Sequence, residues 1–295
     1  MSVKIDDSIK WMLVASFCFA IMGIFVKILS QNLSVLEITF LRNIFGVIVI
    51  GATLYKLPLK GVGGKPLLLF FRGFMGFVSL LAFFYNISHI SLADAMTFSK
   101  TSPIFTAIIA FFVFKEKLSF FGWGAIFLGF FGIVLIMKPD LNIGLKATDF
   151  MGILSGVGAA LAYTSVKELK RYYDTRAIVL SFMIIGSFGP LLMIAFNEVM
   201  HIQSFENFFG KPTFPRGISW LYIVLMGIFA TLAQVFMTRA YGAAKAGIAA
   251  AVSYADIVFA GIFSLILWGV YPDIIGLFGI ILVIVSGVLV AKEKN

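Results

Sequence analysis

Charge, cysteine and histidine are all scarce in this sequence. Charged residues make up 13% of its 295 residues and hydrophobic residues 61%, whereas an ordinary soluble domain is about 25% charged. The single cysteine, Cys18, stands within an apolar segment, so no disulfide can form within the chain. This composition excludes a soluble protein and predicts a polytopic membrane protein whose main neighbour is the lipid bilayer.

The motifs of common enzymes and ATP-driven pumps are also missing. The sequence contains no glycine-rich phosphate loop of the Walker type, no HExxH motif and no CxxC pair. Its two histidines, His89 and His201, lie far apart in predicted connections, without the spacing of metal ligands. The net charge of +9 is not gathered in a basic groove with interleaved aromatic residues. We therefore expect no enzyme activity, no metal or cofactor and no nucleic-acid partner.

Ten long apolar segments account for most of the chain. Each has about the length that crosses the hydrocarbon core of a bilayer, and a spanning backbone must satisfy its own hydrogen bonds, which favours helices. The predicted spans are residues 9–29, 35–55, 67–88, 93–114, 120–138, 149–168, 177–197, 218–239, 246–268 and 274–291. The predicted fold class is an all-α integral membrane protein with ten transmembrane helices.

The basic residues predict which side of the membrane each connection faces. If the N-terminus is cytoplasmic, the outer segments contain Lys138, Lys146, Lys211 and Arg216. The inner segments then contain Lys4, Lys10, Lys56, Lys60, Lys65, Arg72, Lys115, Lys117, Lys167, Lys170, Arg171, Arg176, Arg239, Lys245, Lys292 and Lys294. Because lysine and arginine accumulate in cytoplasmic loops, we predict that both termini are cytoplasmic, in the cytoplasmic (inner) membrane if the source is bacterial.

The second half of the chain weakly repeats the first half. A shift of 154 residues lays Ser99 on Ser253, and slightly shorter shifts align the earlier spans. Five spans per half is an odd number, so the two halves cross the membrane in opposite directions. We therefore predict two inverted five-helix repeats, residues 1–140 and residues 141–295, with a substrate site near the midplane between them.

Short stretches of the first repeat match the motifs of a known transporter family. Residues 84–95 (FYNISHISLADA), 102–105 (SPIF) and 115–118 (KEKL) resemble the EamA-type members of the drug/metabolite transporter superfamily. Residues 41–43 (LRN) and 71–74 (FRGF) further resemble a subgroup that includes S-adenosylmethionine uptake proteins and organic-anion carriers. The resemblance extends over the whole chain and implies a carrier with ten spans in two halves.

Three basic residues lie inside predicted spans, where a charge is costly unless it is paired or hydrated. These three, which are not among the basic residues assigned above to connections, are Lys27 in the first span, Arg42 in the second and Lys100 in the fourth. In the predicted topology all three fall in the outer half of the bilayer. We expect a cavity there that binds a carboxylate or phosphate group, with Arg42 as a bidentate clamp and Lys100 as a point charge. Lys27 also fits a side chain that only extends to the membrane interface.

Acidic residues near these cations indicate counter-charges. Asp256 is predicted near the middle of the ninth span, and Glu37 and Asp94 near the outer ends of the second and fourth spans. We expect Glu37 to pair with Arg42, and Asp94 with Lys100, when no substrate is bound, and a purely structural role stays open for both cations. Asp256 fits either a proton-coupling site, because burial favours the neutral form of a carboxyl group, or a hydrogen bond between helices.

Neutral polar side chains at mid-depth are candidates for the rest of the cavity wall. They are Tyr85, Asn86, Tyr163, Thr164, Gln234 and Tyr254. Gln234 is the most informative of them, because a lone amide needs a hydrogen-bond partner in a dry environment. We expect these side chains to help bind the substrate.

Together these observations predict a secondary-active transporter that exposes one central site alternately to each side of the membrane. The expected substrate is a small, carboxylate-bearing polar metabolite, an organic anion or an amino-acid-like molecule, and a proton or counter-substrate is the expected coupling partner. Two alternatives stay open: an S-adenosylmethionine or drug/amino-acid exporter of the same fold, and a non-transporting membrane assembly component. We expect a monomer or a small homo-oligomer, because the glycine-rich fifth and tenth spans suit packing between copies or between the two halves.

Overall fold

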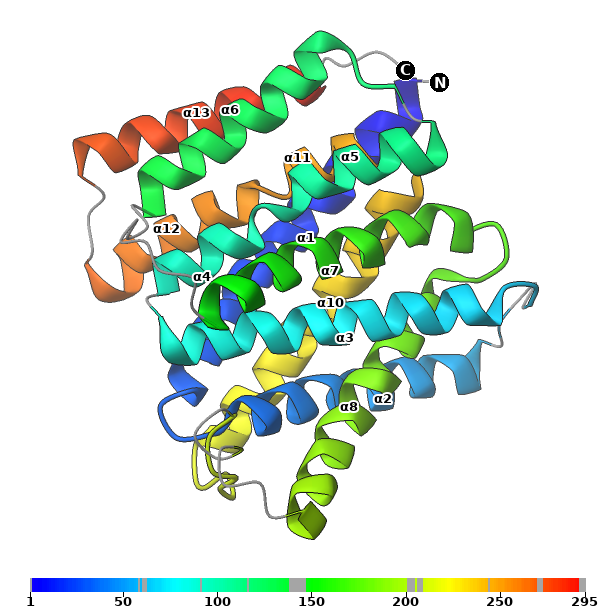
Figure 1. Ribbon diagram of the computed structural model, residues 1–295, viewed down its shortest axis with the longest axis vertical. Helices are drawn as coiled ribbons and strands as arrows, with labels where there is room; N and C mark the ends of the chain where they lie inside the picture. The colour runs from blue at the N-terminus through cyan, green and yellow to red at the C-terminus, as the bar shows by residue number, and fades with distance from the viewer. Residues whose placement is uncertain are drawn as a thin grey trace.

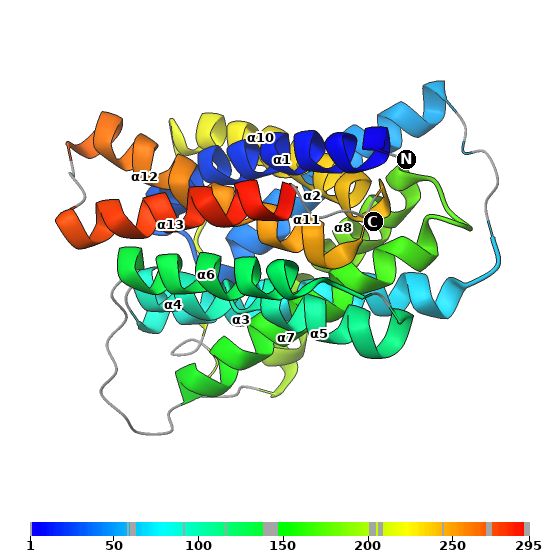
Figure 2. The ribbon, with the colours of Figure 1, turned by 90° about the horizontal axis from the view of Figure 1, so that it is seen from above.

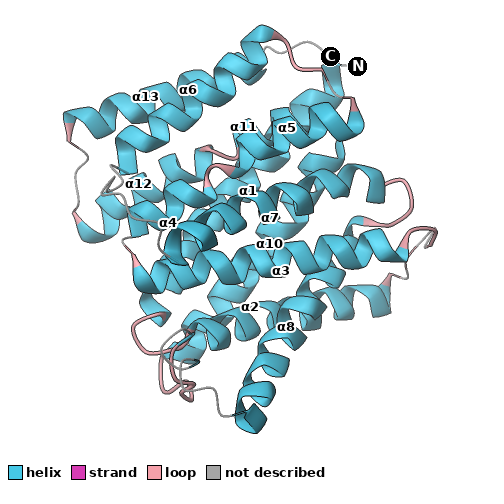
Figure 3. Ribbon diagram, viewed as in Figure 1, coloured by secondary structure: helices cyan, strands magenta, loops and turns pink. Residues whose placement is uncertain are grey.

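Helices make up nearly the whole of the described chain, which contains no strand (Figures 1 and 3). The computed structural model describes residues 2–57, 59, 63–90, 92–115, 117–137, 147–200, 205, 209–243, 245–269 and 273–291. The helices are α1 (Ser2–Leu29), α2 (Val35–Lys56), α3 (Pro66–His89), α4 (Leu92–Ser99), α5 (Ser102–Phe114), α6 (Phe120–Met137), α7 (Ala147–Leu169), α8 (Thr175–Met200), α10 (Ser219–Ala243), α11 (Ala246–Val252), α12 (Ala255–Trp268) and α13 (Ile274–Ala291). The predicted all-α class is confirmed.

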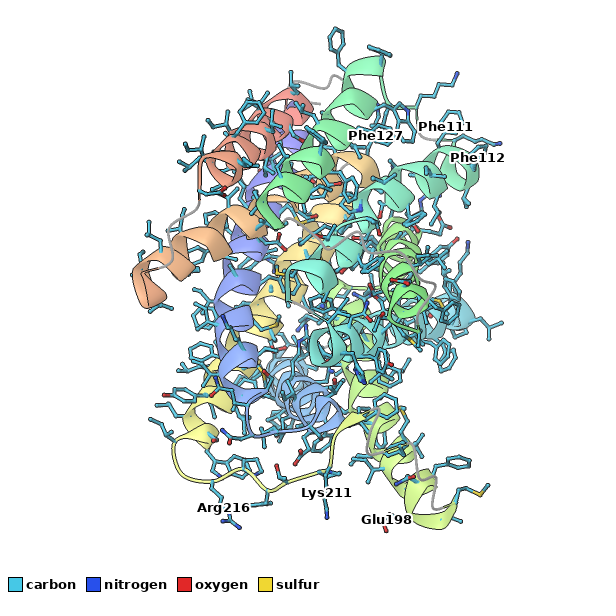
Figure 4. The ribbon with its side chains drawn as sticks, turned by 60° about the vertical axis from the view of Figure 1, so that its left-hand side comes forward. Phe111, Phe112, Phe127, Glu198, Lys211 and Arg216 are labelled. Carbon is cyan, nitrogen blue, oxygen red and sulfur yellow. The ribbon has the colours of Figure 1, made fainter. Side chains whose placement is uncertain are left out.

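Many of these helices have the length and apolarity of membrane spans. Among the described residues, eight segments are long and apolar enough to cross a membrane, by length and composition, and α6 and α13 are shorter apolar helices. Phe112 and Phe127 point away from the bundle and are 67% and 54% exposed (Figure 4). The exposed Lys211 and Arg216 lie instead in the connection between α8 and α10 (Figure 4). This distribution suits a protein whose sides face lipid and whose connections face water.

The fourth and ninth predicted spans are each built from two helices with a break between them. In the first half, α4 ends at Ser99 and α5 begins at Ser102, with Pro103 in its first turn. Proline has no N–H to donate to the carbonyl four residues back, that of Ser99, so the helical hydrogen bonding is interrupted here. In the second half, the break between α11 and α12 lies at Ser253, whose hydroxyl donates to the Ala250 carbonyl at 2.6 Å. Breaks of this kind free polar backbone near the centre of a membrane bundle.

The most extensive packing joins helices of the first half to helices of the second half. α1 lies against α10, α3 against α7, α2 against α8 and α6 against α13 (Figure 2). Serine hydroxyls cross these contacts to backbone carbonyls, as small polar residues do between membrane helices. Ser79 donates to the Ser155 carbonyl at 2.7 Å, and Ser286 donates to the Ala125 carbonyl at 2.7 Å. The glycine-rich faces of α6 and α13 thus pack against each other within one chain.

The connections gather at two ends of the bundle, and the start of α1 and the end of α13 lie at the same end (Figures 1 and 2). At that end, Lys65, just before α3, pairs with Glu168 of α7 at 2.7 Å. At the opposite end, the connection before α10 is held to the turn between α1 and α2, because the Thr213 hydroxyl donates to the Asn32 carbonyl at 2.7 Å. Polar contacts between the two halves therefore occur at both ends of the bundle.

Candidate functional site

A cavity of about 380 Å³ lies between the two halves of the chain. Residues of α1 to α5 form one part of its wall, and residues of α7, α8, α10 and α12 form the rest. The wall is mostly apolar, with a few polar and charged side chains that converge on the cavity. Its volume falls in the range of about 300–1,000 Å³ that is typical of small-molecule sites.

Two buried arginines from different helices line this cavity. Arg42 of α2 is 2% exposed and Arg72 of α3 is 1% exposed. The guanidinium carbon Cζ lies 5.6 Å from the centre of the Phe182 ring for Arg42 and 4.9 Å for Arg72. One aromatic ring of α8, in the second half of the chain, therefore supports two cations from the first half through cation–π contact.

Neither arginine is neutralised by an acidic side chain of the described residues. Among the residues that the structure describes, no carboxylate lies within ion-pair distance of Arg42 or Arg72. Arg42 Nη1 donates to Asn43 Oδ1 at 3.1 Å, and Arg72 Nη2 donates to Gln234 Oε1 at 3.4 Å. Arg72 Nε has no hydrogen-bond partner within the described chain. Charged donors of this kind form their strongest hydrogen bonds with carboxylate and phosphate groups.

Asn43 fixes the position of the Arg42 guanidinium. Its Nδ2 donates to the Thr39 carbonyl at 2.8 Å and to the Gly186 carbonyl of α8 at 3.3 Å, which leaves its Oδ1 to accept from Arg42. A Cβ atom at Gly186 would lie 2.6 Å from Asn43 Nδ2. A glycine is therefore needed at this position for α2 and α8 to approach closely enough to hold the arginine.

A buried ion pair lies in the same cavity. Lys100, at the break between α4 and α5, donates through Nζ to Oδ2 of Asp256 in the first turn of α12. The two side chains are 13% and 17% exposed. The other oxygen of the carboxylate, Asp256 Oδ1, is buried and has no partner within the described chain. Lys100 was expected beside Asp94, whose side chain lies outside the described residues; its partner in the structure is Asp256.

Three further predicted residues also line the cavity. Lys27, in the last turn of α1, is there with an exposed side chain. Gln234 of α10 and Tyr163 of α7 come from the second half. The Tyr163 ring stacks on Tyr241 of α10, with ring centres 5.0 Å apart. The roles of Lys27, Gln234 and Tyr163 in binding stay predictions.

Tyr85, Asn86 and Tyr254 are not among the residues that line this cavity. Tyr85 stacks on His89, with ring centres 3.9 Å apart. Tyr254 packs against α6, where a Cβ atom at Gly129 would lie 2.6 Å from its ring. Asn86 is fully buried, and its side-chain atoms have no hydrogen-bond partner within the described chain. The sequence places these residues at the right depth, but depth does not fix the side of the helix on which a residue lies.

The expected pair between Glu37 and Arg42 is wrong. Glu37 Oε2 accepts the N–H of Ser34, and Oε1 accepts the N–H of Thr213, both at 2.8 Å. The carboxylate thus completes the capping box of α2 and holds the connection before α10. Residues three or four apart share a helix face, whereas the five-residue spacing of Glu37 and Arg42 turns them to different faces.

Arg72 and Phe182 are cavity residues that the sequence analysis missed. The distribution of basic residues assigns Arg72 to an inner connection, because it stands near the start of the third span. In the structure it lies six residues beyond Pro66, about 9 Å along α3, and its side chain is buried. The FRGF stretch that contributed to the family resemblance was the available signal for Arg72. Phe182 offers no such signal, because the chain contains 34 phenylalanines.

Several curated proteins are similar to this chain over its whole length. An uncharacterized transporter of Helicobacter pylori is 36% identical over 96% of this chain and 94% of its own length. The pseudopaline exporter CntI of Pseudomonas aeruginosa is 29% identical over 95% of this chain and 94% of its own. An S-adenosylmethionine uptake transporter of Rickettsia bellii is 22% identical over 97% of this chain and 94% of its own.

A solved crystal structure shares the fold of this chain, and a family match gives its assignment. The crystal structure is 15% identical, covers 96% of both chains and superposes with a TM-score of 0.79, which shows that the fold is shared. The EamA-like transporter family matches the chain twice, over residues 8–138 and over residues 146–292. These names indicate a transporter and not an enzyme. The chain belongs to the EamA-like transporter family, within the drug/metabolite transporter superfamily.

Proposed function

We propose that this chain is a secondary-active carrier that moves small, carboxylate-bearing metabolites through the cavity between residues 1–140 and residues 141–295. The observation that carries the proposal is the pair of buried arginines, Arg42 and Arg72, which no carboxylate of the described chain neutralises. Because Lys100 is paired with Asp256, the two guanidinium groups leave an excess of positive charge in the cavity. A carboxylate or phosphate group satisfies them through bidentate hydrogen bonds.

The packing of the two halves supports an alternating-access mechanism. The contact of α1 with α10 corresponds to the contact of α7 with α3 when the halves are exchanged, and α1 packs on α11 and α12 as α7 packs on α4 and α5. Two inverted five-helix repeats predict this reciprocity. Rocking of one repeat against the other would expose the cavity to each side of the membrane in turn. The basic residues of the connections favour a cytoplasmic position for both termini.

The charge of the cavity favours some substrates of the relatives over others. One relative is named as a pseudopaline exporter and another as an S-adenosylmethionine uptake transporter. The sulfonium group of S-adenosylmethionine is positive, and two guanidinium groups without a counter-ion in the cavity repel it. We therefore rank organic anions and acidic amino-acid-like molecules ahead of S-adenosylmethionine for this chain.

A thermal-shift screen on the purified protein tests the substrate class. Succinate, citrate and phosphate are compared with the cationic lysine and S-adenosylmethionine. A ligand at about 100 times its Kd stabilises the folded state by about 2.7 kcal/mol, so we expect the anions to raise Tm measurably. Arg72→Gln removes this shift, whereas Arg176→Gln, which alters a residue bonded to Asp174 in a connection, keeps it. Stabilisation by the cations alone would contradict the proposal.

Counterflow in proteoliposomes separates a carrier from a non-transporting component. Vesicles loaded with unlabelled succinate are expected to accumulate labelled succinate transiently, and vesicles with the Arg72→Gln protein are expected to accumulate none. Binding of succinate without any flux would assign the chain to the class of non-transporting membrane components.

A further inference from the structure

The Lys100–Asp256 ion pair joins the two broken spans of the molecule. Lys100 follows the last residue of α4, and Asp256 is the second residue of α12, so the pair crosses from the first half to the second. Each charge suits its own helix end, because cations are stabilised near a helix C-terminus and anions near an N-terminus. Any rocking of one half against the other changes the distance across this pair.

The carboxylate of Asp256 has Lys100 as its single hydrogen-bond partner within the described chain. Oδ2 accepts from Lys100 Nζ, and Oδ1 is buried without a partner. The carboxylate is 17% exposed, so water replaces little of what Lys100 supplies. A buried carboxylate that loses its cation is strongly destabilised in the ionised form and becomes neutral by taking up a proton.

The other titratable groups around Asp256 do not offer a substitute for Lys100. On or beside the elements packed around it are Cys18 and Lys27 of α1, Tyr163 of α7, Tyr241 of α10 and Tyr254 next to it in sequence, with Arg42 and Arg72 in the same cavity. The helices α6 and α13 carry no titratable side chain within their bounds. The thiol and phenol groups are neutral near pH 7. The remaining cations face the space that a bound anion would occupy, and so they are drawn to that anion.

We infer that Lys100 exchanges partners when an anion binds: a carboxylate of the substrate takes the place of Asp256 on Lys100 Nζ, and Asp256 takes up one proton. The inference rests on the proposed function, because it requires an anion in the cavity. The charges balance, since the ammonium keeps one carboxylate partner throughout and the released carboxylate is neutralised by a proton that the buffered solution supplies. Only hydrogen bonds to Lys100 are exchanged, and one O–H bond forms on Asp256. One proton therefore enters the cavity with each anion, which couples transport to the proton gradient.

Isothermal titration of the full-length protein with succinate measures this coupling. The heat of binding is compared in two buffers with different enthalpies of ionisation, which gives the number of protons taken up per succinate. We expect about one proton per succinate and an affinity that falls about tenfold per unit rise of pH above neutrality. Asp256→Asn is expected to bind succinate with no proton uptake and without pH dependence. The matched control Asp174→Asn, whose carboxylate pairs with Arg176 in a connection, keeps the wild-type behaviour.

A double variant keeps the test possible if Asp256→Asn alone does not fold. Lys100→Met with Asp256→Asn removes both charges together, and any succinate it binds is expected to bring no proton. Succinate binding to the wild type without proton uptake, or undiminished uptake in Asp256→Asn, overturns the inference and leaves the proposed function standing. A result with aspartate as the ligand would also overturn the inference: binding without proton uptake that is weakened by Asp256→Asn. In that case the ionised Asp256 binds the ammonium group of the aspartate ligand. If succinate, citrate and phosphate all fail to bind, the proposed function fails and this inference fails with it.

Discussion

The two halves of the chain build similar frameworks but contribute opposite chemistry to the cavity. The first half supplies the cations Arg42, Arg72 and Lys100, whereas the second half supplies the neutral Gln234 and the acidic Asp256. The broken spans and the pairing of helices recur in both halves. This difference teaches that similar backbone frameworks form the walls of the cavity, while side chains that the two halves do not share give it its charge.

The position of Lys100 shows most clearly how corresponding positions of the two halves carry different side chains. The shift of 154 residues that relates the two broken spans places Lys100 on Tyr254, which packs against α6 instead of lining the cavity. The acid that pairs with Lys100 stands two residues further on, at Asp256. The two helix breaks are therefore similar in backbone, but the first carries the cation Lys100 and the second carries its counter-charge, Asp256.

Removal of both arginines should have the largest effect on the difference in charge between the two halves of the cavity wall. In the protein with Arg42→Met and Arg72→Met, we expect the affinity for succinate to fall by at least about 100-fold, because two sets of charge-assisted hydrogen bonds are lost. Tm without ligand should stay equal or rise, because replacing unpaired buried charges with apolar groups relieves a desolvation cost. Isothermal titration and thermal unfolding measure the two effects.

Arg239→Met is the matched control for the arginine variant. Arg239 lies on α10 outside the cavity wall, with its guanidinium carbon 5.3 Å from the centre of the Trp11 ring. Its loss should leave succinate affinity unchanged. Retention of wild-type affinity by the double arginine variant would show that the first half does not determine anion binding.

Separation of the Lys100–Asp256 pair should lower the stability of the protein by about as much free energy as the loss of both arginines removes from succinate binding, where 100-fold corresponds to about 2.7 kcal/mol. Lys100→Met deprives the Asp256 carboxyl group of its cation, so that the folded protein must protonate it, and we expect a loss of about 3 kcal/mol in the free energy of unfolding near neutral pH. Addition of Asp256→Asn should recover most of that loss, because no buried acid then has to be neutralised. Thermal unfolding in detergent measures both variants, and a double variant no more stable than Lys100→Met would speak against a mutual dependence of the two residues.

The sequence predicts the framework well because hydrophobic length is a strong signal. All ten predicted spans coincide with apolar helices or helix pairs, since a run of about 20 apolar residues has few other uses. Pro103 also indicates the break in the fourth span. The break at Ser253 has no proline, and no feature of the sequence predicted it; the structure shows it between α11 and α12.

The cavity is harder to predict, because it depends on which sides of helices face each other. The sequence identifies Arg42, Lys100 and Asp256 as charges within spans, but the ion pair between Lys100 and Asp256 joins residues 156 positions apart. Arg72 is hidden among the basic residues of the connections until the structure shows its side chain directed inward. No local pattern encodes such contacts, since they arise when α2, α3 and α8 pack together.

The contact between α6 and α13 offers a region where the two halves should respond alike. A Cβ atom at Gly132 would lie 2.7 Å from the Gly279 carbonyl oxygen, and one at Gly279 would lie 2.6 Å from the Gly132 carbonyl oxygen. Because each clash is with backbone, Gly132→Ala and Gly279→Ala should each destabilise the protein by about 1–3 kcal/mol. Gly124→Ala, on α6 with nothing within 4 Å of its Cβ position, is the control and should be neutral or slightly stabilising. Unequal losses at Gly132 and Gly279 would show that this part of the framework is not symmetric.

The smallest expected effect concerns the Lys65–Glu168 pair, at the end of the bundle where the described chain begins and ends. As in the cavity, the cation comes from the first half of the chain and the carboxylate from the second half. The hydrogen bond to Glu168 raises the pKa of Lys65 above its ordinary value. A raised pKa means that the pair stabilises the folded state fully below the pKa of an unfolded lysine, about 10.4, and that this contribution is lost as the pH rises through the folded pKa. We therefore expect Lys65→Met to lower Tm slightly at about pH 8 and to have no effect once the pH exceeds the raised pKa of Lys65 in the folded protein. In a Glu168→Gln background the same substitution should have no effect at either pH, and a persistent effect there would show that Lys65 acts through packing on Tyr172 and not through its charge.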